Sequence, residues 1–233
     1  MYCERILSKG TPLFRYNLGI NLPEKWDASF YSPEYIYSSF GPKNQIGALF
    51  FYDNEETAHR VLSAANNLKV HAGESYDENT MTSCCLKEAV RLLDISGCIT
   101  PMQVLRILRE EGIDVLNKDF VKHDHGDFSF NELKDDFEFV LTNNDTELFS
   151  TEWKAVYDAS NRINDFFHQK DVDSRYIGQL LTDFQNGISF KAQLTDKGYD
   201  GYCFTEELSP TVCIFDSAKL TAPLHKTIVS QKL

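Results

Sequence analysis

Basic residues are scarce in this 233-residue chain, in which 23 Lys and Arg stand against 35 Asp and Glu for a formal net charge of −12. Proteins that bind DNA or RNA tightly gain much of their affinity by neutralising phosphates with Lys and Arg. The composition therefore argues against a nucleic-acid partner. It leaves room for a local basic pocket that holds a small phosphorylated ligand.

Long apolar runs are also missing, as is an amino-terminal targeting segment. No run approaches the roughly 20 residues that a bilayer-spanning helix needs. The first ten residues, MYCERILSKG, lack the apolar stretch of a secretory signal peptide. We therefore expect no membrane association. We also expect a cytoplasmic protein, or one that is secreted into a host cell without a classical signal peptide.

Metal-binding and nucleotide-binding signatures are absent as well. The six cysteines show no CxxC spacing, and most lie within apolar runs, which is typical of free buried thiols in a reducing compartment. The segment HDHGDFSF, residues 123–130, has two histidines beside two aspartates but no further placed ligands, which favours a solvated loop over a metal site. No Walker-type or GxGxxG loop occurs. We expect no metal cofactor.

The pattern of apolar residues predicts strands toward both ends of the chain. Near the amino terminus, strands are expected at 11–17 and 47–52, the second followed by a helix that Asp53 or Asn54 caps. The ambiguous stretch 81–95 favours two strand-like runs around Lys87 and Glu88. Toward the carboxyl end, apolar runs at 202–204 and 212–215 predict a pair of buried strands, and 226–229 is a further possible strand.

Between these ends the periodicity is helical, over about 100–185. A helix begins at Thr100-Pro101 and ends at Gly112, a second is capped by Asn131, and two more cover 151–169 and 174–186. Their aromatic stripes are typical of a core rather than of a cofactor site. We find no internal repeat, so we expect a single α+β domain over 1–233 with a largely helical insertion.

Two stretches carry charges in apolar surroundings. In TPLFRYN, Arg15 lies between aromatic residues, and because an unpaired buried guanidinium is costly, it must face a polar cleft, a partner carboxylate or solvent. In KGYDGYCFTEELSPTVCIFDSAKL, residues 197–220, two glycines flank a tight turn and the adjacent Glu206 and Glu207 separate two apolar runs. A carboxylate pair at the lip of two buried strands is a candidate catalytic group, or a solvated turn.

The order of these features resembles the ADP-ribosyltransferase superfamily, whose motifs run from Arg or His, through an aromatic or Ser strand, to an acid. GALFFYDNEETAHRVL resembles the family's strand followed by a helix, and the GYDG stretch with VCIFDSAKL resembles the carboxyl-terminal block of bacterial members. MTSCCLKEAVRLLDI resembles the strand pair between them. The resemblance covers about a third of the chain and implies a split antiparallel β-sheet core with flanking helices.

The resemblance also implies roles for particular residues. Arg15, with Tyr16 beside it, would anchor NAD through its diphosphate, because the guanidinium meets phosphate oxygens with two donors. Phe51 or Tyr52 would line the nicotinamide pocket, where an aromatic wall stacks on a flat cationic ring. Glu206 or Glu207 would stabilise the oxocarbenium-like charge that develops when the nicotinamide–ribose bond breaks.

The implied activity is that of an NAD-dependent mono-ADP-ribosyltransferase, a bacterial effector or toxin that modifies a protein target, with NAD as substrate. Two alternatives stay open: an NAD glycohydrolase on the same fold, and a catalytically inactive binding module. The chain departs from the family where many relatives place the acid, because that position falls near Thr211, which leaves the Glu206–Glu207 pair or, less favoured, Asp216. The segment LFRYN also resembles the start of RES-type NAD-consuming toxins, whose helix carries a glutamate about where this chain has Val61.

Overall fold

The structure is a computed structural model with an α+β architecture, as expected. It describes residues 4–19, 25–26, 48–71, 78–115, 119–122, 126–143, 150–169, 178, 181, 184–206 and 209–229. The strands are β1 (Glu4–Leu7), β2 (Pro12–Leu18), β3 (Leu49–Phe51), β4 (Glu78–Cys85), β5 (Val90–Asp94), β6 (Asp119–Lys122), β7 (Gly126–Ser129), β8 (Gly201–Glu206), β9 (Ser209–Ile214) and β10 (Leu224–Val229). The helices are α2 (Glu55–His71), α3 (Pro101–Glu110), α4 (Lys134–Thr142), α5 (Thr151–Gln169) and α7 (Phe184–Asp196).

The strands form a five-stranded sheet in the order β1-β5-β8-β9-β3, a three-stranded sheet in the order β10-β4-β2, and the hairpin β6-β7. An isolated bridge between Phe14 and Tyr52 connects β2 to the residue that follows β3, and so links the two larger sheets. A purely antiparallel core was expected. The five-stranded sheet is mixed instead, because β5 and β8 run parallel. The long helical connection between these two strands permits that arrangement.

The two larger sheets share one apolar cluster, to which each contributes one face. Leu13, Cys84 and Leu86 of the three-stranded side meet Cys203 and Val212 of the five-stranded sheet. This cluster is the inter-sheet core, and the faces that form it are called the inner faces below. Since side chains alternate along a strand, the inner face of β2 carries residues 13, 15 and 17, and that of β4 carries 80, 82 and 84.

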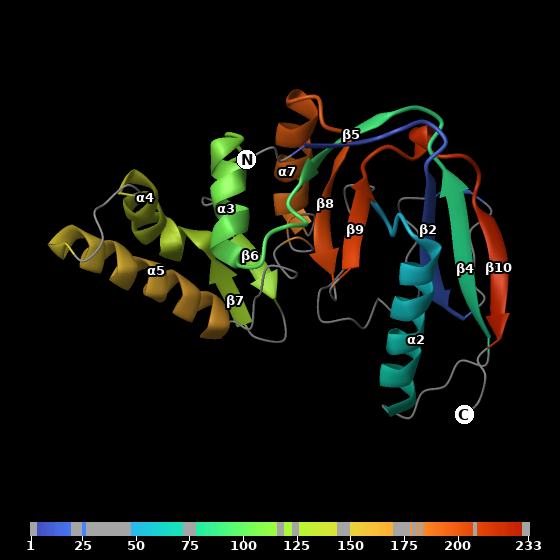
Figure 1. Cartoon of the computed structure of the whole chain (residues 1–233), viewed down its shortest axis with the longest axis horizontal. Helices are drawn as coiled ribbons and strands as arrows, with labels where there is room; N and C mark the ends of the chain where they lie inside the picture. Colours follow the sequence, from blue (N-terminus) through green and yellow to red (C-terminus); the bar gives the residue numbers. More distant parts are fainter. Residues whose placement is uncertain are drawn as a thin grey trace.

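Helices cover the two outer faces. The other face of the five-stranded sheet, with Leu93 and Tyr202, packs in a large cluster with residues of α3, α5 and α7. The outer face of the three-stranded sheet packs against α2 through Leu62 and Met81. Figure 1 shows α2 next to β2, and α3, α4, α5 and the β6–β7 hairpin on the opposite side of β8 and β9.

Several boundary predictions are confirmed. The two runs around Lys87-Glu88 are β4 and β5. Asn54 caps α2, because its Oδ1 accepts a hydrogen bond from the Thr57 amide at 3.1 Å. Thr100 and Gln103 form a capping box at the start of α3. Gly112 follows the end of that helix with φ +66°, a conformation that favours glycine.

Two predictions, the loop at 123–130 and the cap at Asn131, are wrong. The segment taken as a loop at 123–130 includes β7, which pairs with β6, although residues 123–125 lie outside the described residues. Asn131 does not cap α4, because it lies in a 3₁₀ turn, Phe130–Leu133, and Leu133 is the N-cap residue. The helix expected at 174–186 falls mostly outside the described residues, and α7, which begins at Phe184, was not expected. Neither was β1, whose four residues are too few for a clear pattern.

The cysteines are free and mostly buried, as the sequence predicts. Of the five within the described residues, all are free, and Cys84, Cys98, Cys203 and Cys213 are buried. Among the described residues no group of three or more His, Cys, Asp or Glu could hold a metal ion. Over the same ranges, no helix combines the length and apolar character needed to cross a membrane.

Candidate functional site

The GYDG turn before β8 is a structural junction. Gly198 adopts φ +78°, which favours glycine. The Asp200 carboxylate accepts a hydrogen bond from the Arg91 amide at 2.8 Å and pairs with the Lys219 ammonium at 2.8 Å, so it joins β5, β8 and the turn after β9. Hydrogen bonds to Asp200 and Glu88 raise the pKa of Lys219. The carboxylate of this motif therefore stabilises the fold.

Tyr199 of the same turn is also held on both sides. Its hydroxyl donates to a Glu111 carboxylate oxygen at 3.1 Å, and the Arg91 guanidinium lies over its ring at 4.2 Å from the centroid. Burial, followed by the nearby Glu111 carboxylate, raises the pKa of Tyr199. The turn is thus fixed between β5 and the end of α3.

Gly201 begins β8 where two strands approach closely. A Cβ at this position would lie 1.9 Å from the Cys213 carbonyl oxygen, so no other residue fits without moving the backbone. This contact sets the β8–β9 hairpin, in which Tyr202 pairs with Cys213 and Glu206 with Ser209. The hairpin matches the two buried runs expected from the sequence.

The candidate acids lie at the tip of this hairpin. Glu206 is the last residue of β8, opposite Ser209, but its side chain is not described, and Glu207 lies outside the described residues. The tip is tied to α2, because Arg60 Nη2 donates to Ser209 Oγ at 2.7 Å. The less favoured acid, Asp216, instead caps a short 3₁₀ turn by accepting from the Ala218 amide at 2.8 Å.

Arg15 lies on the inner face of β2, two residues beyond the buried Leu13. It is opposite Thr82 of β4 and next to Phe14, whose amide and carbonyl bond to Tyr52 at 2.8 and 2.6 Å. The positive charge of Arg15 acts on Cys84 in the inter-sheet core. Burial raises the pKa of the Cys84 thiol to about 12, and the Arg15 charge opposes that rise. Arg15 therefore lies on the inner face of the three-stranded sheet, one step along β2 from the apolar contact that Leu13 makes.

The tyrosines expected beside Arg15 are on the other face of the sheet. Tyr16 and Tyr52 stack at 6.5 Å between ring centroids, with planes 9° apart, in the cluster that α2 covers. The reason is the two-residue period of a strand, which turns residues 15 and 16 to opposite sides. The Tyr16 and Tyr52 rings therefore lie on the opposite face of the sheet from Arg15.

Phe51 does lie on the inner face but is inside the core. Its side chain has no exposed surface, and its ring meets the edge of Trp26 at 5.3 Å. Trp26 in turn donates from Nε1 to the Thr221 carbonyl at 2.6 Å. A ring enclosed in this way fills the inter-sheet core rather than offering a face to a ligand.

Polar side chains that the sequence analysis missed continue the inner face beyond Arg15. Thr82 Oγ1 lies 2.9 Å from His225 Nδ1 of β10, and both residues pair directly across the strands. Thr80 Oγ1 donates to the Gly19 carbonyl at 3.1 Å, and Asn17 is buried beside it. The alternation of Thr80 and Thr82 in NTMTSCC is visible in the sequence, but His225, the partner of Thr82, is 143 residues away.

A second missed group lies on the inner face of the five-stranded sheet, on the same side of β1 as Leu7. Arg5 of β1 forms an ion pair with Asp53, the residue between Tyr52 and the Asn54 cap. Burial lowers the pKa of Arg5, but Cys203, Asp53 and Asp94 raise it more, so the net shift is upward. Burial, with a contribution from Asp94, raises the pKa of the Cys203 thiol to about 12, against the effect of Arg5. This pair joins the first strand to the turn that begins α2.

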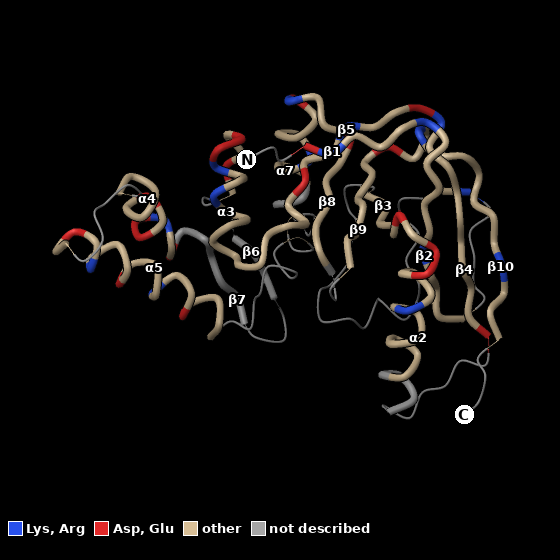
Figure 2. Tube along the Cα trace, viewed as in Figure 1, with Lys and Arg blue, Asp and Glu red and all other residues tan. Residues whose placement is uncertain are grey.

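Figure 2 shows how the charges are distributed around these groups. Lys and Arg lie among Asp and Glu along α3 and α5, whereas β9, between β8 and β3 in the five-stranded sheet, carries no charge. β10, an edge strand of the three-stranded sheet, carries Lys226. The candidate residues that the sheet brings side by side are Arg15, Thr82 and His225, on the inner face of β2, β4 and β10.

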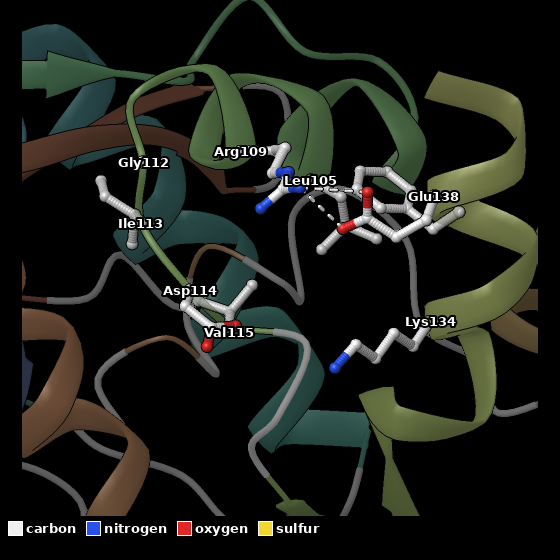
Figure 3. Close-up of a pocket in the computed structure, with 9 residues that line it drawn as sticks. Leu105, Arg109, Gly112, Ile113, Asp114, Val115, Lys134 and Glu138 are labelled. Carbon is white, nitrogen blue, oxygen red and sulfur yellow. Dashed lines mark hydrogen bonds and ion pairs between the residues drawn. The ribbon is translucent and has the colours of Figure 1, made fainter. Parts of the chain in front are cut away.

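A cavity of about 320 Å³ lies elsewhere, between α3 and α4 (Figure 3). The buried Leu105 and Phe137 are among the residues that line it. Arg109 reaches across its rim to Glu138, with Nη2 3.1 Å from Oε1. None of the residues expected to bind NAD lines it, so it is distinct from the candidate site.

Comparisons with known proteins do not identify a family. No family model matches the chain, and no curated protein matches it. Among solved structures it is similar to a chain in the crystal structure of the M. tuberculosis MbcT-MbcA toxin-antitoxin complex, with 7% sequence identity and a TM-score of 0.40 over 96% of this chain and 87% of that chain. A likeness this distant carries no functional argument.

Proposed function

We propose that this chain is an NAD-dependent mono-ADP-ribosyltransferase that cleaves the nicotinamide–ribose bond and transfers ADP-ribose to a protein target, as a bacterial toxin or effector does. The observation that carries the proposal is the place of Arg15: a strand arginine on an inner face, where the apolar contact of two sheets gives way to Thr82 and Asn17. That is where a guanidinium can meet a diphosphate between two sheets.

The chemistry requires three contributions from the chain. Arg15 holds the diphosphate of NAD in a bidentate manner. A carboxylate of Glu206 or Glu207, carried by the hairpin that Gly201 and Arg60 hold in place, stabilises the positive charge on the ribose as nicotinamide leaves with the bonding electrons. A nucleophile of the target protein then forms the new bond to the same ribose carbon and loses its proton. NAD is the substrate, and no metal takes part.

The experiment is incubation with NAD labelled on its adenine half, with nicotinamide release and labelled protein measured together. We expect nicotinamide release, and label on a target protein when cell lysate is added. The double variant Glu206→Gln/Glu207→Gln should lose release while its melting temperature stays close to that of the wild type, and full activity in it would exclude both acids. Arg109→Gln, at the rim of the separate cavity, is a matched control that should keep full activity.

The same experiment separates the alternatives. Free labelled ADP-ribose with no labelled protein would identify an NAD glycohydrolase, with water as the acceptor. No nicotinamide release and no NAD-dependent rise in melting temperature would identify a binding module without catalysis.

A further inference from the structure

We propose that the cavity between α3 and α4, called the α3–α4 cavity below, binds a small neutral aromatic molecule of about the size of indole (Figure 3). Its described lining residues come from α3, from the turn after α3 and from α4, and none of them comes from β2, β8 or β9. The inference therefore does not depend on the proposed function.

The two helices contribute one side each to the α3–α4 cavity. Leu105 and Arg109 lie four residues apart on α3, and Lys134 and Phe137 lie three residues apart on α4, so each pair shares one side of its helix. Gly112 ends α3 with φ +66° and turns the chain, so that the residues after it also line the cavity. The concave shape thus follows from the end of α3 and from how α4 lies beside it.

Buried apolar side chains form much of the lining. Leu105 and Phe137 are 1% and 0% exposed, and Ile113 and Val115 are buried as well, although all four border the cavity. A ring placed against these side chains gains dispersion contacts and leaves water. Phe137 favours an aromatic ligand over an aliphatic one, because paired rings are more stable than their buried area accounts for.

The volume of the cavity matches a ligand with two fused rings. It measures about 320 Å³, at the lower end of the range of roughly 300–1,000 Å³ for small-molecule sites. An apolar cavity of about 150 Å³ holds one benzene ring. The α3–α4 cavity therefore accommodates about two rings. A rigid, flat molecule also loses little conformational freedom when it binds.

The charged side chains of the lining favour a neutral ligand. They are two cations, Arg109 and Lys134, and two carboxylates, Asp114 and Glu138, so their charges cancel. Arg109 and Glu138 pair with one another, with Nη2 3.1 Å from both carboxylate oxygens, and are 55% and 36% exposed. A neutral ligand leaves that pair intact. An ionised ligand would lose its hydration without meeting a net opposite charge, and would bind more weakly.

Another explanation of the cavity is a packing gap between two helices that takes no ligand. Both explanations predict that a larger apolar side chain in the lining fills the gap without unfolding the chain. Only a binding site predicts that indole binds to the wild type and that the same substitution weakens it. Affinity therefore separates the two explanations, and stability alone does not.

The test is isothermal titration of the whole chain with indole and with two charged analogues, indole-3-acetate and tryptamine. We expect a Kd below about 1 mM for indole, and binding at least about tenfold weaker for each analogue. Methyl NMR spectra should locate the bound ring. Indole should shift the methyl signals of Leu105 and Val115 and leave those of Leu86, in the inter-sheet core, unchanged.

Leu105→Phe should weaken indole at least about tenfold, because its added atoms occupy the cavity. Val115→Ile adds one methyl group and should weaken indole less, and it serves as the test if Leu105→Phe does not fold. Ile99→Phe is the matched control, since it places a ring at an 81% exposed position before α3 and should keep the affinity of the wild type. Melting temperatures check that each variant is folded.

Four results would overturn the inference. They are no binding of indole by the folded wild type, tighter binding of a charged analogue than of indole, indole-induced shifts that omit Leu105 and Val115, and unchanged affinity in the folded cavity variants. Nicotinamide release is measured separately, so a failure of the proposed function would leave this result as it stands.

Discussion

The inner face of the three-stranded sheet has two unlike halves that come from the same strands. Its apolar half, with Leu13, Cys84 and Leu86, closes against the five-stranded sheet. Its polar half consists of Arg15, Thr82 and His225. Arg15 lies two residues from Leu13 on β2, and Thr82 lies two residues from Cys84 on β4. The difference shows that position along a strand, rather than the strand itself, separates residues that stabilise the fold from the arginine proposed to bind NAD.

The largest effect should come from Gly201→Ala in the strand that the apolar half packs against. The new Cβ would meet the Cys213 carbonyl oxygen at 1.9 Å, and neither backbone can yield without breaking the β8–β9 pairing. We expect a loss of at least about 3 kcal/mol in the free energy of unfolding, measured by urea denaturation. Gly97→Ala is the control, since no atom lies within 4 Å of its Cβ position. Equal stability of the two variants would contradict the described hairpin.

Leu86→Ala should have the next largest effect. The side chain is 1% exposed within the inter-sheet core, so its removal should cost about 2–5 kcal/mol in the free energy of unfolding. Leu224→Ala, at 69% exposure on β10, should cost less than about 0.5 kcal/mol. A comparable cost for both would mean that the two sheets do not share a core.

The apolar half was largely predictable from the sequence and the polar half was not. Apolar runs such as 202–204 and 212–215 predict buried strands from the local pattern alone. The helix caps at Asn54 and Thr100 are also local, because each bonds to a residue three positions further on. The alternation of side chains along β2 was equally local, and it separates Arg15 from Tyr16. The family resemblance groups the two residues because it follows neighbours in sequence, which a strand places on opposite faces.

What sequence reasoning could not supply was pairing between distant segments. The contact of Thr82 with His225 requires that β4 and β10 be neighbours, and the Arg5–Asp53 pair requires that β1 reach the turn before α2. No local pattern encodes those choices. The same holds for the role of Asp200, whose partners Arg91 and Lys219 come from two other segments.

Thiol reactivity should distinguish the two faces of β4 at adjacent residues. Burial raises the pKa of Cys84 to about 12, so it holds almost no thiolate at pH 8, whereas Cys85 is partly exposed. We expect a thiol reagent to modify Cys85 at least about tenfold faster than Cys84. Cys84→Ser and Cys85→Ser variants assign the rates, and faster modification of Cys84 would place it outside the inter-sheet core.

The smallest effect should lie away from both halves, at the Asp136–Arg162 pair between α4 and α5. The hydrogen bond from Arg162 lowers the pKa of Asp136. Stability from this pair is therefore present above the unfolded pKa of an aspartate and is lost as the pH falls through the lower folded value. Asp136→Asn should remove that dependence in unfolding curves taken below pH 4, while Asp135→Asn should preserve it. Because the pair is largely exposed, the change should be smaller than that of either core variant.

The most direct test of the account is the rate of nicotinamide release from NAD by the wild type and by Arg15→Ala, with the melting temperature of each recorded alongside. The account predicts release by the wild type and a loss of at least about 100-fold in the variant, because the diphosphate loses a bidentate charged contact and the ribose its orientation. It also predicts melting temperatures that differ little. Equal rates in the two proteins, or no release by a folded wild type, would contradict it.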